Sequence, residues 1–385
     1  MPFADGRARL LGAKFRSATL HRAAVVVLFA TSVCASPVRV ATLGGDSRLL
    51  LDSTNLFNYP ALVRQLAHAD VELFDDWAGV ALRVGKRHGV GLFLNRPDEE
   101  LDELSAYLAG TGSQLLRSLE PRPWLDAIYG LQLRPGLSLG AGLRYAYDVR
   151  DQGIDEASVA RLDGRLSVAL GTGDRRLDAS LRLQRVALHD RSAGVSREES
   201  DGDGFGIDLR GRLAMGDDAV LLPSVLWRRS AFGLAPQERE EEELRGSLSV
   251  NVRPVSTVLG VLGIIVGGHW QRLDVPGDGL QATERRRWLL PAVIAGGEIQ
   301  VGSLVFRLGA RHESVLEEVE GPNGVDQSFD AGLVTDLGLG FEFGDLAVDG
   351  MLEKNFLRDG PHFIGGSSRG GGLLTTLSLL YRLYP

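Results

Sequence analysis

The stretch Glu243–Arg253, ELRGSLSVNVR, alternates strictly between two kinds of side chain. Leu248 and Val250 belong to an apolar or small set, while Arg245 and Asn251 belong to the polar set between them. Side chains on a β-strand point to opposite faces with a period of two. The stretch therefore predicts a strand with one apolar wall and one charged wall.

The same alternation recurs along the chain. These stretches exceed the roughly 5–6 residues of an average strand and match the roughly 9–11 residues that a tilted strand needs to cross a bilayer. They include RLDGRLSVAL at 161–170, FGIDLRGRLAM at 205–215, LVFRLGARHE at 304–313 and FDAGLVTDLGLGFEF at 329–343.

The connections between these strands alternate in length. Short turns are expected at 85–89, 134–136, 171–175, 216–218, 253–256, 301–303 and 343–345. Long polar loops are expected around 97–123, 150–158, 189–204, 232–242, 274–285, 316–327 and 357–370. Short turns at one end and long loops at the other are typical of outer-membrane barrels. We therefore predict an all-β, up-and-down antiparallel transmembrane β-barrel of about 14–16 strands.

Aromatic residues provide an independent indication. All five tryptophans are expected at the level of the long loops, with Tyr145 and Tyr147, while another group is expected at the opposite rim. That group comprises Phe341, Phe343, Tyr381 and Tyr384. Membrane barrels carry such girdles at both interfaces. A large secreted β-sandwich or propeller is the alternative, since it also has alternating strands, but it has no reason to sort its tryptophans to one end.

The first 35 residues differ from the rest. A basic leader precedes the apolar run Ala23–Ala30, and SVCAS places Val33 and Ala35 at the positions that signal peptidase reads. We predict a cleaved signal peptide over 1–35 and location in the outer membrane of a Gram-negative bacterium. Cleavage would remove Cys34, the one cysteine, leaving no disulfide or thiol chemistry.

Composition and motifs exclude several function classes. The formal net charge of −8 disfavours a nucleic-acid partner. No histidine spacing suits a metal, and SDGDG at 200–204 lacks an oxygen ligand where Phe205 stands. His189-Asp190 has no identifiable nucleophile beside it. We therefore expect no cofactor, no metal and no enzymatic activity.

Residues 38–68, VRVATLGGDSRLLLDSTNLFNYPALVRQLAH, fit no spanning strand. They resemble the opening segment of FadL-type outer-membrane channels for long-chain fatty acids and other hydrophobic compounds, although Tyr59 separates the Asn from the Pro-Ala. The matching residues are Gly44, Gly45, Asp52, Asn58, Pro60 and Ala61. The resemblance implies a plug over 36–68 within a barrel over 69–385, and a hydrophobic ligand that passes through a gap in the wall. Related barrels with the same opening serve secretion systems instead.

The polar faces of the strands predict a charged lumen. Arginines dominate the middle strands and carboxylates the late ones. The expected lumen-lining residues are Arg161, Arg165, Arg182, Arg210, Arg212, Arg245, Arg253, Arg307, Arg311, Asp330, Asp336 and Glu342. Closure of the barrel would pair these charges across the lumen, or the arginines would favour anionic solutes, because a guanidinium binds a carboxylate through two hydrogen bonds.

The stretch 98–119 places leucines at helical spacing and predicts an amphipathic helix over the barrel mouth. The leucines are Leu101, Leu104, Leu108, Leu115 and Leu119. The acidic runs at 98–103 and 238–243 are expected to be solvated.

Together these patterns predict an outer-membrane channel for passive passage of hydrophobic or small solutes, gated by the plug. The alternative is a barrel that transports nothing and acts as a scaffold in secretion or envelope assembly. Expected partners are outer-membrane lipid, lipopolysaccharide, the barrel-assembly machinery, which reads a C-terminal aromatic, and a small hydrophobic ligand.

Overall fold

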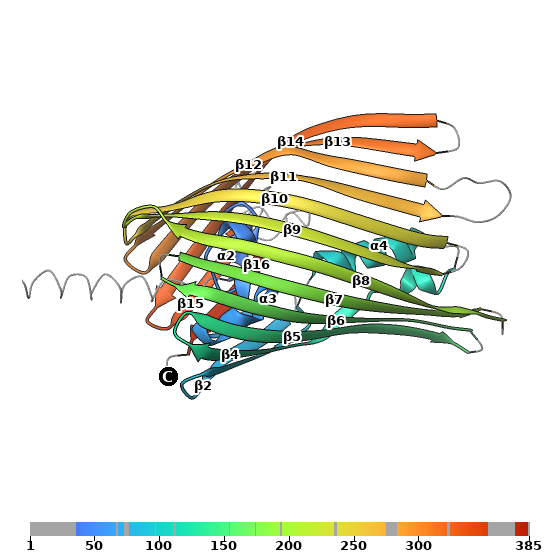
Figure 1. Cartoon of the computed structure of the whole chain (residues 1–385), viewed down its shortest axis with the longest axis horizontal. Coiled ribbons are helices and arrows are strands. Elements are labelled where there is room, and N and C mark those ends of the chain that lie inside the picture. The colour runs from blue at the N-terminus through green and yellow to red at the C-terminus, as the bar shows by residue number, and fades with distance from the viewer. Residues whose placement is uncertain are drawn as a thin grey trace, which may run out of the picture.

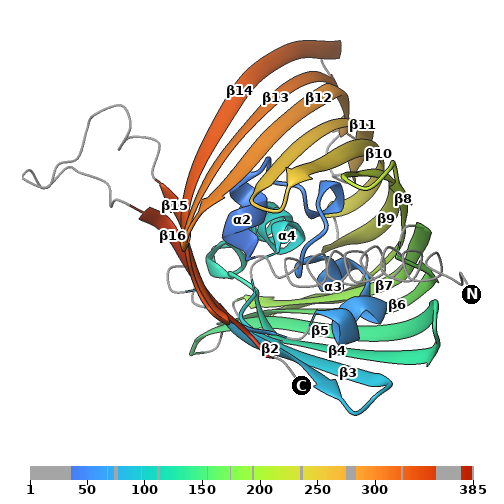
Figure 2. The same ribbon diagram turned by 90° about the vertical axis from the view of Figure 1, so that its left-hand side faces the viewer.

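A computed structural model describes residues 36–66, 68–72, 77–96, 98–110, 113–153, 155–173, 175–192, 195–234, 237–274, 283–321, 324–352 and 374–383. Sixteen antiparallel strands form one closed barrel in which each strand pairs with its neighbours in sequence and β1 pairs with β16 (Figures 1 and 2). The predicted barrel is confirmed, at the upper end of the expected strand number. The predicted signal peptide and Tyr384 lie outside the described residues.

The strands differ greatly in length. They are β1 (His68–Glu72), β2 (Trp77–Val84), β3 (His88–Leu94), β4 (Arg122–Arg134), β5 (Leu137–Gln152), β6 (Asp155–Thr172), β7 (Arg175–Ser192), β8 (Val195–Ala214), β9 (Ala219–Leu234), β10 (Gln237–Val255), β11 (Val258–Asp274), β12 (Thr283–Val301), β13 (Leu304–Gly321), β14 (Gly324–Phe343), β15 (Leu346–Leu352) and β16 (Leu374–Arg382). No helix among the described residues has the length and hydropathy to cross a bilayer.

The alternating faces are arranged as the sequence predicts. On β10, Leu248 is 47% exposed while the adjacent Ser249 is 1% exposed. On β13, Phe306 is 47% exposed while Arg307 is 5% exposed. The apolar side chains thus form the outer surface, which lipid would cover, and the polar side chains point into the barrel.

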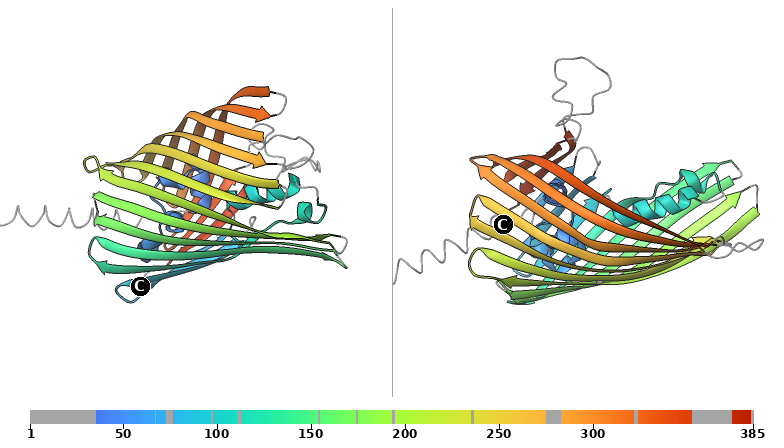
Figure 3. Two further views of the ribbon diagram at one scale, coloured as in Figure 1. Left: turned by 45° about the vertical axis from the view of Figure 1, so that its right-hand side comes forward. Right: turned by 90° about the horizontal axis from the view of Figure 1, so that it is seen from above.

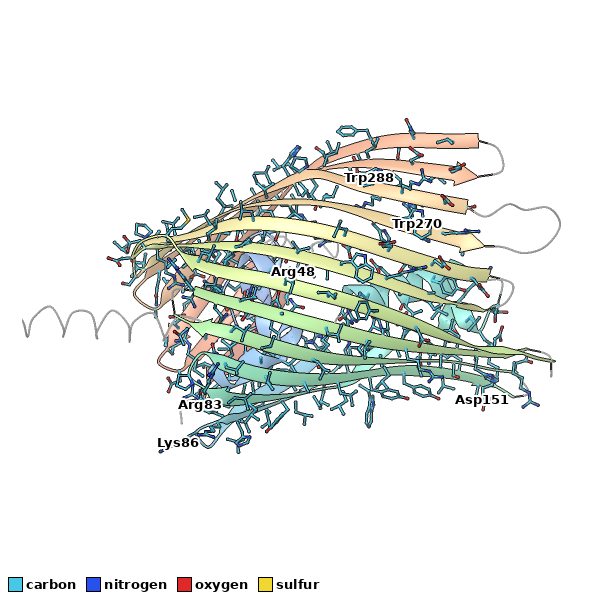
Figure 4. The ribbon with its side chains drawn as sticks, in the orientation of Figure 1. Arg48, Arg83, Lys86, Asp151, Trp270 and Trp288 are labelled. Carbon is cyan, nitrogen blue, oxygen red and sulfur yellow. The ribbon has the colours of Figure 1, made fainter. Side chains whose placement is uncertain are left out.

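The turns at one end are short, as predicted. Gly136 in the turn between β4 and β5 has φ +78° and Gly302 in the turn between β12 and β13 has φ +64°. Only glycine adopts this backbone region without steric cost. We call this the short-turn end and the opposite end the far end. Figure 4 shows Arg83 and Lys86 at the former and Asp151 at the latter.

Four of the predicted long loops are wrong. The stretches 150–158, 189–204, 232–242 and 316–327 belong largely to β5–β10, β13 and β14, which continue to close turns. Polar residues stand on both faces there, and that composition suits a loop as well as it suits a strand in water. The connection at 97–123 is truly long, whereas 275–282 and 357–370 lie outside the described residues.

The wall is tall on one side and low on the other (Figure 3). Strands β5–β14 have 16 to 20 residues each. Strands β1–β3, β15 and β16 have 5 to 9 residues among those described. Since roughly 9–11 residues cross the hydrocarbon, the tall side projects well beyond it at the far end.

Among the described residues, the aromatic prediction holds except at Trp77. Trp124 and Trp288 are 75% and 50% exposed on the outer surface, and Figure 4 shows Trp270 and Trp288 toward the far end. Trp77, predicted in the same girdle, is instead 2% exposed, and its ring lies 6.5 Å from that of Phe57 inside the barrel. Trp77, at the start of β2 in the low wall, therefore fills part of the lumen.

We expect Leu248→Arg to destabilise the barrel by about 2–4 kcal/mol, because it places a charge near the middle of the apolar band. Unfolding by urea in lipid vesicles measures the change. Leu244→Arg is the matched control on the same face. Leu244 pairs with Trp227 near the aromatic girdle, where the expected cost is only about 0–1 kcal/mol. Equal costs at both positions would contradict an apolar band that ends near Trp227.

Candidate functional site

The barrel is filled by two segments that enter from opposite ends. The plug, residues 36–66, comprises α2 (Pro37–Thr42), η1 (Ser47–Leu49), α3 (Asn55–Asn58) and η2 (Pro60–Gln65) and lies toward the short-turn end (Figures 2 and 3). The second segment follows β3 and comprises α4 (Glu99–Gly110) and η3 (Leu116–Ser118) near the far end. Of the stretch 36–68 predicted as the plug, residues 36–66 lie inside the barrel, and His68 already begins β1.

Glycines in the wall let the plug backbone approach closely. A Cβ on Gly140 of β5 would lie 2.1 Å from the backbone nitrogen of Ala61, and a Cβ on Gly309 of β13 would lie 2.6 Å from the carbonyl oxygen of Thr42. Such distances exclude any side chain. These wall positions are therefore shaped to the plug, which explains why glycines interrupt inward-facing strand surfaces.

The residues that carried the FadL-type resemblance stabilise the plug itself. Gly44 and Gly45 adopt φ +120° and +81°. Asp52 is buried, and its Oδ1 accepts hydrogen bonds from the backbone nitrogen and hydroxyl of Thr54 and from the amide of Asn55. Burial raises the pKa of Asp52 despite these bonds. These residues fix the plug's turns.

The other three shape the second half of the plug. Asn58 donates a hydrogen bond to the hydroxyl of Ser47. Pro60 begins η2, and the backbone nitrogen of Ala61 donates to Ser167 Oγ at 2.8 Å. These six residues hold the segment folded and seated, and three of them, Gly45, Asp52 and Asn58, also line cavities beside it.

Ion pairs tether the plug to the wall at two places. Arg39 Nε lies 2.6 Å from Glu298 Oε2, and Arg307 Nε lies 2.7 Å from the same oxygen. Ser36 Oγ donates to Asp349 Oδ2 at 2.8 Å, and that carboxylate also accepts from Arg307. The wall carboxylates are thus shared between plug and wall donors.

The second tether lies on β8. Arg48 Nε donates to Asp208 Oδ2 at 3.0 Å, and the hydroxyl of Tyr59 donates to the other oxygen of the same carboxylate. The Tyr59 ring also lies under the guanidinium of Arg210, 4.7 Å from its carbon. One wall carboxylate therefore binds two separate turns of the plug.

Helix α4 packs against the inner wall through its leucines. The predicted residues are all buried in one cluster. They are Leu101, Leu104, Leu108, Leu115 and Leu119, and they contact the wall side chains Ala146, Ala157, Val159, Val186, Leu188 and Phe232. The amphipathic helix is confirmed, but it lies inside the wall. An apolar landing site for a ligand would need the face that the wall already covers.

Glu100, at the first turn of α4, is bound by three wall arginines. Arg228 Nη1 lies 2.9 Å from its carboxylate, and Arg161 and Arg182 also donate to it. Burial alone would raise the pKa of Glu100, but Arg182, Arg161 and Arg228 outweigh it and hold the pKa well below its usual range. Asp98 likewise pairs with Arg144. The acidic run 98–103 is therefore not simply solvated, because two of its carboxylates anchor α4.

A chamber of about 500 Å³ lies between the plug and α4. Its charged lining consists of Asp46, Arg48, Arg96, Asp98, Glu100, Glu103, Arg165, Arg182, Asp208, Arg228, Glu243, Arg245, His269, Arg287, Arg311 and Glu313. We call it the central chamber. Four predicted lumen residues, Arg165, Arg182, Arg245 and Arg311, meet here.

A second cavity of about 280 Å³ lies on the other side of the plug, where Asp217 and Asp218 of a short turn line it. Three further predicted residues, Arg210, Arg212 and Arg253, face it together with Arg39 and Arg176 of the plug and wall. Seven of the arginines predicted to line the lumen thus form two groups, one on each side of the plug.

The remaining predicted residues are dispersed. Arg161 and Arg307 are buried in the ion pairs described above. Asp330 is exposed on the projecting part of β14, Asp336 is half-buried, and Glu342 accepts hydrogen bonds from Gln300 and Arg382. The predicted pairing of these arginines with carboxylates of late strands is seen at Arg307, which binds Asp349 of β15. Most of the other arginines pair with carboxylates on nearby strands and on the two inserted segments.

Sequence reasoning missed the carboxylates that organise the lumen. Asp163 accepts from Arg144 at 2.6 Å and from Arg182 at 2.9 Å. Asp178 accepts from Arg210 at 2.8 Å. Both stand two or four residues from an arginine on the same strand face, and that spacing was a usable signal.

The described residues contain no group of three or more His, Cys, Asp or Glu side chains arranged to hold a metal ion. The lumen is instead a network of guanidinium–carboxylate pairs.

No protein-family model matches the sequence, and no curated protein matches it. Solved structures that resemble the fold include the FrpB iron transporter of Neisseria meningitidis (TM-score 0.42, 7% identity, 73% of this chain and 59% of that one). They also include the siderophore receptor PirA of Acinetobacter baumannii (TM-score 0.38, 8% identity, 74% of this chain and 62% of that one). A third is the ferric-catecholate import receptor Fiu of E. coli (TM-score 0.37, 9% identity, 83% of this chain and 74% of that one). The chain spans about 59% to 61% of the FrpB chains it matches.

At such low sequence identity and structural similarity, these likenesses identify no ligand for this chain. They do not support the FadL-type assignment. Passive passage of hydrophobic compounds is not supported either, because the chamber that the lumen encloses is lined by charges. The chain is a closed sixteen-stranded antiparallel barrel of the outer-membrane kind, with a plugged and charged lumen.

Proposed function

We propose that this protein is an outer-membrane transporter that admits small polar or charged solutes to the central chamber and passes them when the plug moves. The observation that carries the proposal is the chamber itself, about 500 Å³ of charged space between two inserted segments. That volume lies within the roughly 300–1,000 Å³ of ordinary small-molecule sites. Lipid and lipopolysaccharide would cover the apolar outer wall.

The resting state is closed at the short-turn end. Wall glycines contact the plug backbone directly, and two sets of ion pairs hold it. Passage therefore requires movement of the plug, in contrast to an open pore. The FadL-type plug gate is retained in this proposal, while the hydrophobic solute is replaced by a polar one.

A scaffold without transport is the second candidate. The same tethers favour it, because a plug with so many contacts resists displacement. The two functions differ in one respect: only a transporter needs the plug to move while it works.

We expect a disulfide between plug and wall to abolish solute flux. A Cβ on Gly338 would lie 3.1 Å from Cβ of Thr42, near the roughly 3.5–4.5 Å of a disulfide. Thr42→Cys with Gly338→Cys, in a Cys34→Ser background, should block uptake of small sugars and amino acids into proteoliposomes when oxidised, and a thiol reductant should restore it.

Thr42→Cys alone is the matched control and should transport as the parent does. Flux that persists through the oxidised pair would refute plug gating. No flux in the parent, in the reduced pair and in a chain without residues 36–66 would favour the scaffold.

A further inference from the structure

The plug places one of its own carboxylates among wall arginines of the central chamber. Asp46 lies at the start of η1, and its Oδ2 is 3.9 Å from Arg245 Nη1 of β10 and 3.5 Å from Arg48 Nη1. Arg311 of β13 is also close, with Nη1 3.4 Å from the position of a Cβ on the adjacent Gly45. Asp46 is 9% exposed, so this carboxylate is held between plug and wall.

These contacts are loose compared with the others in the lumen. Arg39, Arg48 and Arg307 bind their wall carboxylates at 2.6 to 3.0 Å. The wall arginines near Asp46 keep a third of their side chains accessible to the chamber, 33% for Arg245 and 35% for Arg311. An ion pair of 3.9 Å to a guanidinium that is one-third exposed is weaker than these closer contacts, so a better-placed carboxylate would replace it.

A third wall arginine lines the same chamber as Arg245 and Arg311. It is Arg287 of β12, whose strand partner on β13 is Glu317, with which it interacts electrostatically. Arg245, Arg287 and Arg311 thus present guanidiniums from three strands to one space, and a guanidinium can bind a carboxylate through two parallel hydrogen bonds. Arg245 binds Glu243 and Arg311 binds Glu313. Each of these two guanidiniums has further N–H donors that can bind a second carboxylate.

We propose that the central chamber binds a small carboxylate solute through Arg245, Arg287 and Arg311, and that the solute does so by displacing Asp46 of the plug. Asp46 occupies the solute's position in the resting state. Its displacement removes one contact between the plug and β10 and so couples binding to loosening of the plug. This inference rests on the proposed function, since it names the solute class and the trigger of that same chamber.

Glu100 on α4 provides a contrast within the same chamber. Three arginines bind it, and Arg228 does so at 2.9 Å. A solute cannot compete with that arrangement, so α4 stays in place while Asp46 yields. The two inserted segments therefore have different roles. The carboxylate of α4 stays bound to the wall, whereas the carboxylate of the plug exchanges with the solute.

Equilibrium dialysis of the detergent-solubilised full chain against radiolabelled succinate tests the proposal. We expect saturable binding that succinamide, the neutral analogue, does not compete for. Arg245→Gln and Arg311→Gln should each weaken binding by about tenfold, the effect of one charge-assisted hydrogen-bonded contact. Asp46→Asn keeps the Oδ1 that accepts from the backbone of Arg48 and should tighten binding about two- to fivefold by removing the competitor.

Arg229→Gln is the matched control, because Arg229 belongs to β9 but lines the outer surface. A second measurement is the rate of trypsin cleavage after Arg48, which succinate should increase in the parent and not in Asp46→Asn. Unchanged affinity in Asp46→Asn would overturn the displacement, and equal affinity for succinamide would overturn the carboxylate. Binding as expected without flux would count against transport alone, and flux without succinate binding would count against this inference alone.

Discussion

Gly140→Val should unseat the plug and turn a nearly silent barrel into a conducting one. The new Cβ would lie 2.1 Å from the nitrogen of Ala61 and 2.3 Å from the carbonyl carbon of Pro60. Both are backbone atoms, so no side chain can rotate away, and η2 must shift. Overpacking of this kind costs about 1–3 kcal/mol or more, and the plug is the part that can move, because β5 is held by strands on both sides.

Single-channel recording in planar bilayers measures the result, with tryptic cleavage after Arg64 as the report on plug release. Gly164→Val is the matched control. It lies on the neighbouring β6, and its Cβ would meet nothing closer than 4.0 Å, so it should behave as the parent. A released plug with unchanged conductance would mean that another element closes the lumen; a plug that stays protected would mean that the contact at Gly140 is not what seats it.

Glu100→Gln should undock α4 from the wall. The substitution leaves Arg161, Arg182 and Arg228 without the carboxylate they share. Removing one partner of a buried ion network costs about 3–5 kcal/mol. Hydrogen exchange followed by mass spectrometry should show protection of 98–110 falling by about two orders of magnitude or more, while protection of the wall strands is unchanged.

The pH dependence has a definite sign. The pKa of Glu100 is held well below its usual range, so its stabilisation is complete above the ordinary glutamate pKa and is lost only as pH falls through the lowered value. Docking of α4 should therefore survive at pH 4 in the parent. Glu103→Gln is the matched control on the same helix: burial raises the pKa of Glu103, so neutralising it should leave protection equal or slightly higher. The same loss in both variants would refute a specific role for Glu100.

The sequence predicts a part of the fold well where the surroundings of that part, lipid on one face and water on the other, impose a regular pattern on its residues. Strict alternation around Leu248 and Phe306 predicts the wall and its faces, because lipid outside and water inside impose a period of two on every residue. Beyond the bilayer, water is on both sides. The stretch 316–327 therefore loses its alternation and resembles a loop, although it is strand on both sides of a close turn.

The interior was harder to predict because its contacts join segments far apart in the chain. The helical spacing of Leu101, Leu104 and Leu108 predicts α4, but nothing in the run of acids says that Glu100 meets wall arginines rather than water. The same holds for Gly140 and Gly309. Each is one glycine among 49 in the chain, and its role appears only when the plug backbone lies against it.

The cations of the lumen are arginines, and this has a practical consequence. The chain has three lysines, of which Lys14 and Lys354 lie outside the described residues and Lys86 stands in the turn after β2. Among the described residues, amine-reactive dyes therefore meet a lysine at the short-turn end and nowhere else. In a chain with Lys14→Arg and Lys354→Arg, a reagent that cannot cross the envelope would report through Lys86, from whole and from broken cells, whether that end looks outward.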